Sequence, residues 1–241
     1  MAMTLEELVQ QLRSAYGAHL SSVVLYGSGA SGDYVEGKSD YNVLVLLDRI
    51  DVGTLAAASS VARAWREFGN PPPMTMTVDE WRRSADVFPM EYSDILQRNR
   101  VLHGEPPFEG IAISREHLRL QLEQQVMGKL LRLRQGALLA GTDGKRQLEL
   151  ICDSLSTIMV LFRAVLRLKG EQPPAEHAAV AERVAALAGF DASPFVGTVR
   201  HVRGAKKIAP IDAGATLALY LTGVERLDAF LDTFTTQEKA L

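Results

Sequence analysis

The chain has 241 residues, of which 47% are hydrophobic and 23% charged, and its formal net charge is −3. This composition is that of a globular protein with room for two modest domains, and it gives no general affinity for nucleic acid or an anionic membrane. The single cysteine, Cys152, excludes an intramolecular disulfide and a metal site of several cysteines. No apolar run approaches ~18 residues and the acidic N-terminus does not resemble a signal peptide, so we expect a cytoplasmic protein without a membrane partner.

The first predicted elements are a helix and a strand. Thr4 and Glu7 have the spacing of a capping box, leucines then recur on one helical face, and Gly17 suits the end of the helix. The apolar run from Val23 to Tyr26 is short and contains β-branched residues, as buried strands do. We therefore expect a helix over residues 4–17 that leads into a strand.

A glycine-rich polar segment connects this strand to a second apolar run, Val43 to Leu47, and it matches two nucleotide-binding motifs. Gly27, Gly29 and Gly32 have the spacing G-x-G-x-x-G of dinucleotide-binding folds, and Gly32 to Ser39 have the spacing G-x-x-x-x-G-K-S of P-loops. Both motifs need a helix directly after the glycines, so that its N-terminus faces the phosphates. A strand follows instead, which argues against both interpretations.

The same segment resembles the signature of the polymerase β-like nucleotidyltransferases, in which Gly-Ser is followed, after a short connection, by Asp-x-Asp. Gly27 and Ser28 match the first part, and Asp40 and Asn42 match the second. Residues two apart on a strand point to the same face, so Asp40 and Asn42 would share one. The resemblance includes the bacterial aminoglycoside-type nucleotidyltransferases. It implies that Asp40 and Asn42 hold Mg²⁺ and that Gly27 and Ser28 cradle the triphosphate of ATP or another NTP.

Asn42 is the first departure from this signature, because the family pattern has a second aspartate there. An amide oxygen can still ligate a hard cation, but it carries no charge. One unit charge at ~4 Å in an effective dielectric of ~20 contributes roughly 4 kcal/mol, which is about three decades in rate if it is all lost at the transition state. Lys38 and Ser39, directly before Asp40, are further candidates for binding the nucleotide.

The next elements are a helix through residues 55–68 and a strand over Met74 to Val78 that alternates between polar and apolar residues. In the resembled family the third catalytic carboxylate lies on this strand, whereas its outward positions here are Thr75 and Thr77. Thr77 and Glu80 have capping-box spacing, so the acids beyond the strand are expected to begin a helix rather than bind a metal.

The segment from Asp86 to Gly104 is similar to a segment of bacterial homologues of the aminoglycoside nucleotidyltransferases. Two interpretations of it stay open. Glu91 could supply a substitute catalytic carboxylate, or the segment could form a surface helix whose acids pair with Arg98 and Arg100. Ion pairs and solvated faces are commoner than ligands, which favours the second interpretation.

The sequence predicts two domains and an α+β fold class. Residues 1–108 would form the nucleotidyltransferase-like domain, a mixed sheet with flanking helices, and the proline-rich stretch Glu105 to Phe108 would end it. Residues 109–241 would form an antiparallel helical bundle. Its helices are expected from Ser114, over roughly 143–170 and 175–187, briefly after an N-cap at Ser193, and from near Asp212.

The resemblance implies Mg²⁺-dependent transfer of a nucleoside monophosphate from an NTP, with ATP the expected donor, to a hydroxyl of a small molecule or a protein. Asp40, Asn42 and Glu91 are the candidate catalytic residues. The alternative is a catalytically inactive protein of the same fold that binds a nucleotide or a partner, and Asn42, Thr75 and Thr77 favour it. The expected partners are an NTP and its acceptor, nucleic acid is not expected, and a homodimer is possible.

Overall fold

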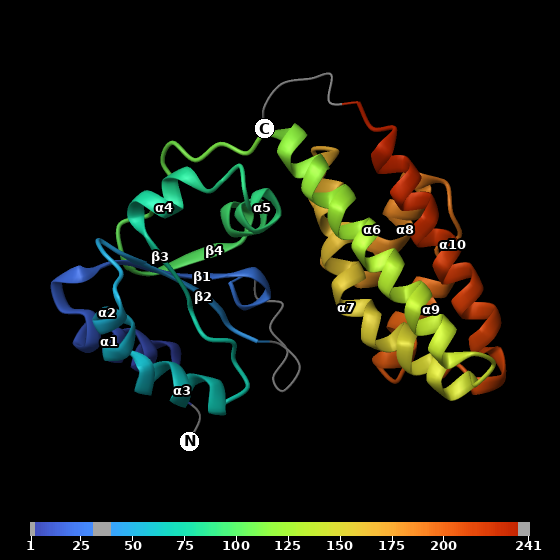
Figure 1. The fold of residues 1–241 in the computed structure, drawn as a ribbon, viewed down its shortest axis with the longest axis horizontal. Helices are drawn as coiled ribbons and strands as arrows, with labels where there is room; N and C mark the ends of the chain where they lie inside the picture. Colours follow the sequence, from blue (N-terminus) through green and yellow to red (C-terminus); the bar gives the residue numbers. More distant parts are fainter. Residues whose placement is uncertain (1–2, 31–39, 236–241) are drawn as a thin grey trace. The chain divides into compact units, whose positions relative to one another are not determined.

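The computed structural model (Figure 1) describes residues 3–30 and 40–235. The chain forms two compact units, Met1–Ile113 and Ser114–Leu241. The boundary predicted from the sequence lies between residues 108 and 109, just after the proline-rich stretch.

The first unit is built on a mixed sheet of four strands in the order β3-β2-β1-β4. The strands are β1 (Leu20–Tyr26), β2 (Asn42–Leu47), β3 (Met74–Thr77) and β4 (Asn99–Gly104). β1 pairs antiparallel with β2 and with β4, and β2 pairs parallel with β3. The two central strands are the two apolar runs of the sequence, and their side chains are buried on both faces of the sheet.

Helices cover both faces of this sheet (Figure 1). On one side are α1 (Leu5–Tyr16), α2 (Val52–Ala57) and α3 (Ser59–Glu67), and on the other are α4 (Val78–Arg83) and α5 (Pro89–Gln97). The predicted capping boxes that open α1 and α4 are both formed. The core on the side of α1 and α3 consists of alternate residues of β1 and β2 with apolar helix residues, among them Leu8, Leu12, Trp65, Val23, Leu25, Val43, Val45 and Leu47.

Three local predictions differ from the structure. The helix expected through residues 55–68 is two helices, α2 and α3, which meet at Ala58. β4 was not predicted, because Asn99–Gly104 is largely polar and forms a strand by pairing with the free edge of β1. Ser193 is the first residue of its helix, and the N-cap is Ala192.

The second unit is helical, as predicted. Its helices are α6 (Arg115–Ala140), α7 (Gly144–Leu168), α8 (His177–Ala188), α9 (Ser193–Val202) and α10 (Ala213–Asp232), with a single 3-10 turn, Pro210–Asp212, before α10. The aromatic rings of Phe162, Phe195 and Tyr220 pack against one another at tilted angles in its core. The predicted fold class, a mixed sheet with flanking helices followed by a helical bundle, is confirmed. In the described part of the chain, no helix is long and apolar enough to cross a membrane.

Candidate functional site

The turn after β1 is the structural centre of the candidate site. Gly27 has a φ of +73°, a conformation that residues with a Cβ rarely adopt. Its N–H donates to the carbonyl of Arg98 at 3.0 Å, and its own carbonyl accepts from the N–H of Ala30 at 3.1 Å. A short 3-10 turn, Gly27–Gly29, follows the strand. The predicted Gly-Ser turn therefore exists, and Arg98, the residue between α5 and β4, holds it in place.

Two polar side chains from different elements approach Gly27. A Cβ built on this glycine would lie 3.6 Å from Nδ2 of Asn42 and 3.6 Å from Oδ2 of Asp94. Asn42 begins β2, where its backbone pairs with that of Tyr26, and Asp94 comes from α5. The structure thus brings together the Gly-Ser turn, the second position of the Asp-x-Asn motif and a carboxylate that the sequence analysis did not assign to the site.

An ion pair with Arg98 fixes the side chain of Asp94. Its Oδ1 accepts from the guanidinium of Arg98 at 2.7 Å, one helical turn further on, and both side chains are about three-quarters buried, with exposed fractions of 25% and 23%. The backbone carbonyl of Arg98 is the acceptor for Gly27. The same arginine therefore orients the carboxylate and the turn.

The charges of two carboxylates of α5 affect the pKa of Tyr26. Burial, then the negative charge of Asp94 and then that of Glu91 together raise the pKa of this phenol from 10.0 to about 12. Glu91 and Asp94 are three residues apart on α5 and so lie on one side of that helix. Glu91 is exposed, whereas Asp94 is largely buried. Both acids therefore lie near the carboxyl end of β1.

Tyr41 fixes the orientation of the residues on either side of it. Its ring stacks on Trp65 of α3 at a centroid distance of 6.1 Å, and its N–H donates to Oδ1 of Asn70 at 3.0 Å. Alternation along an extended chain turns Asp40 and Asn42 to the opposite face. Asp40 is exposed and lies two residues before Asn42. This arrangement fits the predicted sharing of one face by the two motif residues.

The strand expected to carry a third carboxylate provides none. Oγ1 of Thr75 donates to the carbonyl of Pro73 at 3.2 Å, and Thr77 caps α4 by accepting from the N–H of Glu80 at 3.1 Å. Among the residues the structure describes, no group of three or more His, Cys, Asp and Glu side chains is arranged to hold a metal ion. The carboxylate that lies beside Gly27, that of Asp94, comes from α5 and not from β3.

Two predicted nucleotide-binding residues, Lys38 and Ser39, lie outside the described residues. Ser28 lies in the 3-10 turn. The interpretation of the α5 segment as a helix whose acids pair with arginines holds for Asp94 and Arg98, while Arg100 is on β4. The signal that could have placed Asp94 in the site is its spacing from Glu91, which marks an acidic side of a short helix.

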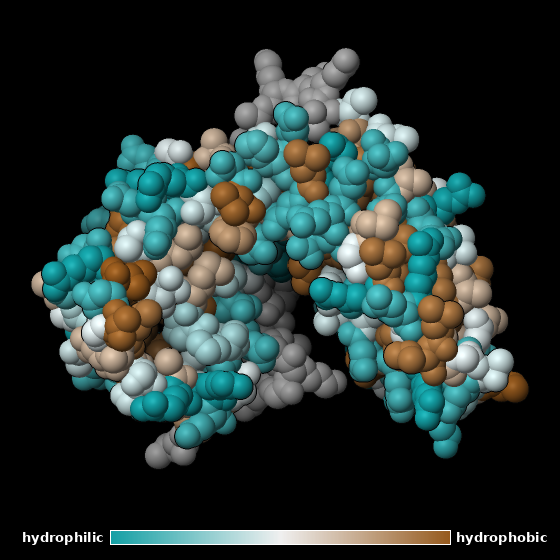
Figure 2. Space-filling view, viewed as in Figure 1, coloured by the Kyte–Doolittle hydropathy of each residue, from teal (hydrophilic) through white to brown (hydrophobic). Residues whose placement is uncertain are grey.

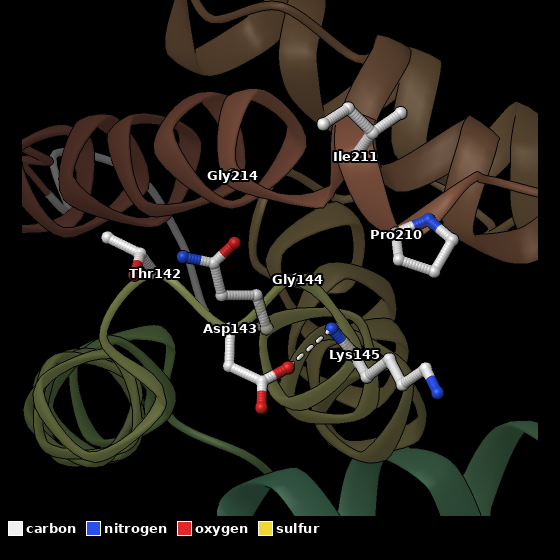
Figure 3. A pocket seen from close by; sticks show the side chains of 8 residues that line it. Thr142, Asp143, Gly144, Lys145, Pro210, Ile211 and Gly214 are labelled. Carbon is white, nitrogen blue, oxygen red and sulfur yellow. Dashed lines mark hydrogen bonds between the residues drawn. The ribbon is translucent and has the colours of Figure 1, made fainter.

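A separate cavity of about 520 Å³ lies in the second unit (Figure 3). Its charged groups are few, and its carboxylate, Asp143, caps α7 by accepting from the N–H of Lys145 at 2.9 Å. Gly144 packs so closely on the carbonyl of Pro210 that a Cβ would collide with it. These contacts show that the residues lining the cavity have structural roles.

The comparisons with known proteins identify the fold. No protein-family model matches the sequence, and no curated protein matches it significantly. The arrangement of the sheet, its helices and the following bundle is that of the polymerase β-like nucleotidyltransferase fold. The chain is similar to spectinomycin adenyltransferase AAD(9) from Enterococcus faecialis, whose crystal structure contains ATP and spectinomycin. The match covers 95% of this chain and 100% of that one, with a TM-score of 0.60 and 12% sequence identity. At this identity the likeness shows the fold alone.

Proposed function

We propose that this protein is a nucleotidyltransferase that uses Mg²⁺ and ATP to transfer AMP to a hydroxyl of a small molecule or a protein. The observation that carries the proposal is the meeting of Asn42 and Asp94 at Gly27, on a nucleotidyltransferase fold. Asp40 precedes this point by two residues and is exposed. The solved relative in fold binds ATP and spectinomycin, and spectinomycin is one member of the proposed class of acceptors.

The residues of the candidate site suit a magnesium ion that binds together with a nucleotide. Asp40, Asn42 and Asp94 carry the hard oxygen donors that Mg²⁺ prefers. Mg²⁺ is usually held by one or two carboxylates together with substrate phosphates and water, rather than by a cage of protein ligands. A site with Asp40 as its chief carboxylate therefore fits Mg²⁺–ATP better than free Mg²⁺. When bound, the ion would neutralise charge on the triphosphate.

The proposed chemistry is an in-line displacement. The acceptor oxygen attacks the α-phosphorus of ATP, the bond to the bridging oxygen of the β-phosphate breaks, and pyrophosphate leaves. The N–H groups of the turn that begins at Gly27 bind phosphate oxygens. Glu91, an exposed acid on the same side of α5 as Asp94, takes the proton of the acceptor hydroxyl.

A second candidate function rests on the uncharged positions. Asn42 stands where the family pattern has its second aspartate, and the outward positions of the strand that carries the third carboxylate are Thr75 and Thr77, which have structural hydrogen bonds. A protein that binds nucleotide without transferring it would have the same fold and the same turn. Binding of Mg²⁺–ATP without any transfer would favour this second function.

The test is transfer of label from ATP labelled at the α-phosphate to a panel of hydroxyl compounds and to protein. We expect labelled product from the wild type and less from Glu91→Gln. Asn42→Asp should accelerate transfer, by as much as three decades if the full ~4 kcal/mol of one charge is recovered. The matched control is Glu109→Gln, because Glu109 is an exposed acid of the same unit. Absence of transfer by the wild type and Asn42→Asp over the whole panel would contradict the proposal.

A further inference from the structure

Helix α6 has two apolar faces. Leu118, Leu122, Val126, Leu130 and Leu133 form the first, which is buried in the second unit. The second consists of Leu120, Met127, Leu131 and Leu138, with exposed fractions of 47%, 40%, 49% and 83%. We call these four residues the α6 stripe. At about 100° per residue they fall within a narrow sector opposite the buried face. Hydrophobic residues recur along α6 in the space-filling view, which has the orientation of Figure 1 (Figure 2).

The spacing of the α6 stripe is the same in both directions along the helix. Leu120 and Leu138 lie nine residues on either side of position 129, and Met127 and Leu131 lie two residues on either side of it. A second α6 in antiparallel orientation, centred on the same position, would place Leu120 opposite Leu138 of the other copy and bring the two central residues together. This symmetry is what a two-fold interface between identical helices requires, because each residue then meets its counterpart twice.

The polar residues beside the stripe follow the same symmetry. Glu123 and Arg134 lie on one side of it and Gln124 and Gln135 on the other, each pair nearly centred on position 129. In the antiparallel pair Glu123 faces Arg134 of the other copy. Arg134 already pairs with Glu225 at 2.9 Å, but its side chain is 50% exposed and its guanidinium has further donors. Glu123, paired with Arg119, is 33% exposed.

We propose that two copies of this chain associate through the α6 stripe as an antiparallel, two-fold symmetric helix pair. The apolar residues form the centre of the interface and the charged and amide side chains form its rim, as in other protein interfaces. The occupant is a second copy because only an identical helix has both the reversed apolar spacing and the matching charges. The proposal does not depend on nucleotide binding at Gly27.

Disulfide trapping tests the orientation. In a Cys152→Ser background, the double variant Leu120→Cys/Leu138→Cys should form a disulfide-linked dimer under mild oxidation. Each single variant should stay monomeric in denaturing gels, because in an antiparallel pair its two copies lie ~27 Å apart, far beyond the reach of a disulfide. A parallel pair would instead trap both single variants. That result, or no trapping in the double variant, would overturn the proposal.

Light scattering after gel filtration tests the interface in the native chain. We expect the mass of two chains for the wild type and of one chain for Leu131→Glu, with unchanged helical circular dichroism. Ile211→Glu is the matched control, since Ile211 is 90% exposed in the same unit and lies outside the stripe, and it should remain dimeric. A monomeric wild type, or a dimer that Leu131→Glu leaves intact, would contradict the proposal.

Discussion

Asp94 is the residue that most changes the interpretation of this site. It lies beside Gly27, is oriented by Arg98 and acts on Tyr26 through its charge. In the family pattern the third carboxylate lies on the strand that corresponds to β3. The motifs alone therefore do not indicate that an acid of α5 lies beside the turn. Asp94 reaches the turn from α5, whereas the hydroxyls of Thr75 and Thr77 on β3 bond to Pro73 and to the start of α4.

The pKa of Tyr26 provides a prediction at this scale. It is raised from 10.0 to about 12, first by burial and then by Asp94 and Glu91. Asp94→Asn should lower it towards its ordinary value, Glu91→Gln should lower it less, and Asp79→Asn on α4 should not change it. The measurement is an ultraviolet titration of phenol ionisation, with Tyr26→Phe used to identify the signal. An unchanged Tyr26 pKa in Asp94→Asn would contradict the placement of this carboxylate.

The same shift predicts how stability depends on pH. Because the folded pKa of Tyr26 is above the unfolded value, the stabilisation is complete below pH 10 and is lost as the pH rises towards 12. Tyr26→Phe should therefore show a smaller loss of unfolding free energy over this window than the wild type. Denaturant titrations at several alkaline pH values would measure the difference, and equal losses in both proteins would contradict it.

The 3-10 turn Gly27–Gly29, directly after β1, is the element that the proposed site depends on. Gly27→Ala should cost about 1–2 kcal/mol of stability, because an L-residue is strained at positive φ. It should also weaken nucleotide binding, since the new Cβ would stand between Asn42 and Asp94. The matched control is Gly110→Ala, with a φ of +77° in the same unit and no atom within 4 Å of its Cβ. A similar loss of nucleotide binding in both variants would contradict a specific role for Gly27.

The sequence predicts the elements whose signals are local and misses those that depend on long-range pairing. The capping boxes of α1 and α4, the two central strands and the long helices follow from spacing and periodicity. β4 does not, because its polar residues become a strand only when the edge of β1 is there to pair with them. The place of Asp94 in the candidate site is not predicted for the same reason, because most of the first unit separates it from Gly27 in the sequence.

At the scale of the whole molecule, each of the two units has its own core. Trp65→Ala in the first and Phe195→Ala in the second should each cost ~3–5 kcal/mol, because both side chains are fully buried. We expect hydrogen exchange measured by mass spectrometry to increase mainly in the unit that carries the substitution. Equal acceleration throughout both units would show that the chain unfolds as one cooperative body.

The central claim is that Asp40 and the Gly27 turn hold Mg²⁺–ATP, and calorimetric titration of ATP with and without Mg²⁺ tests it most directly. We expect Mg²⁺-dependent binding by the wild type, its loss in Asp40→Ala and tighter binding by Asn42→Asp. Asp48→Ala is the control, since Asp48 follows the far end of β2, is 54% exposed and pairs with His19. Equal binding by the wild type and Asp40→Ala, or no binding by any variant, would contradict the account.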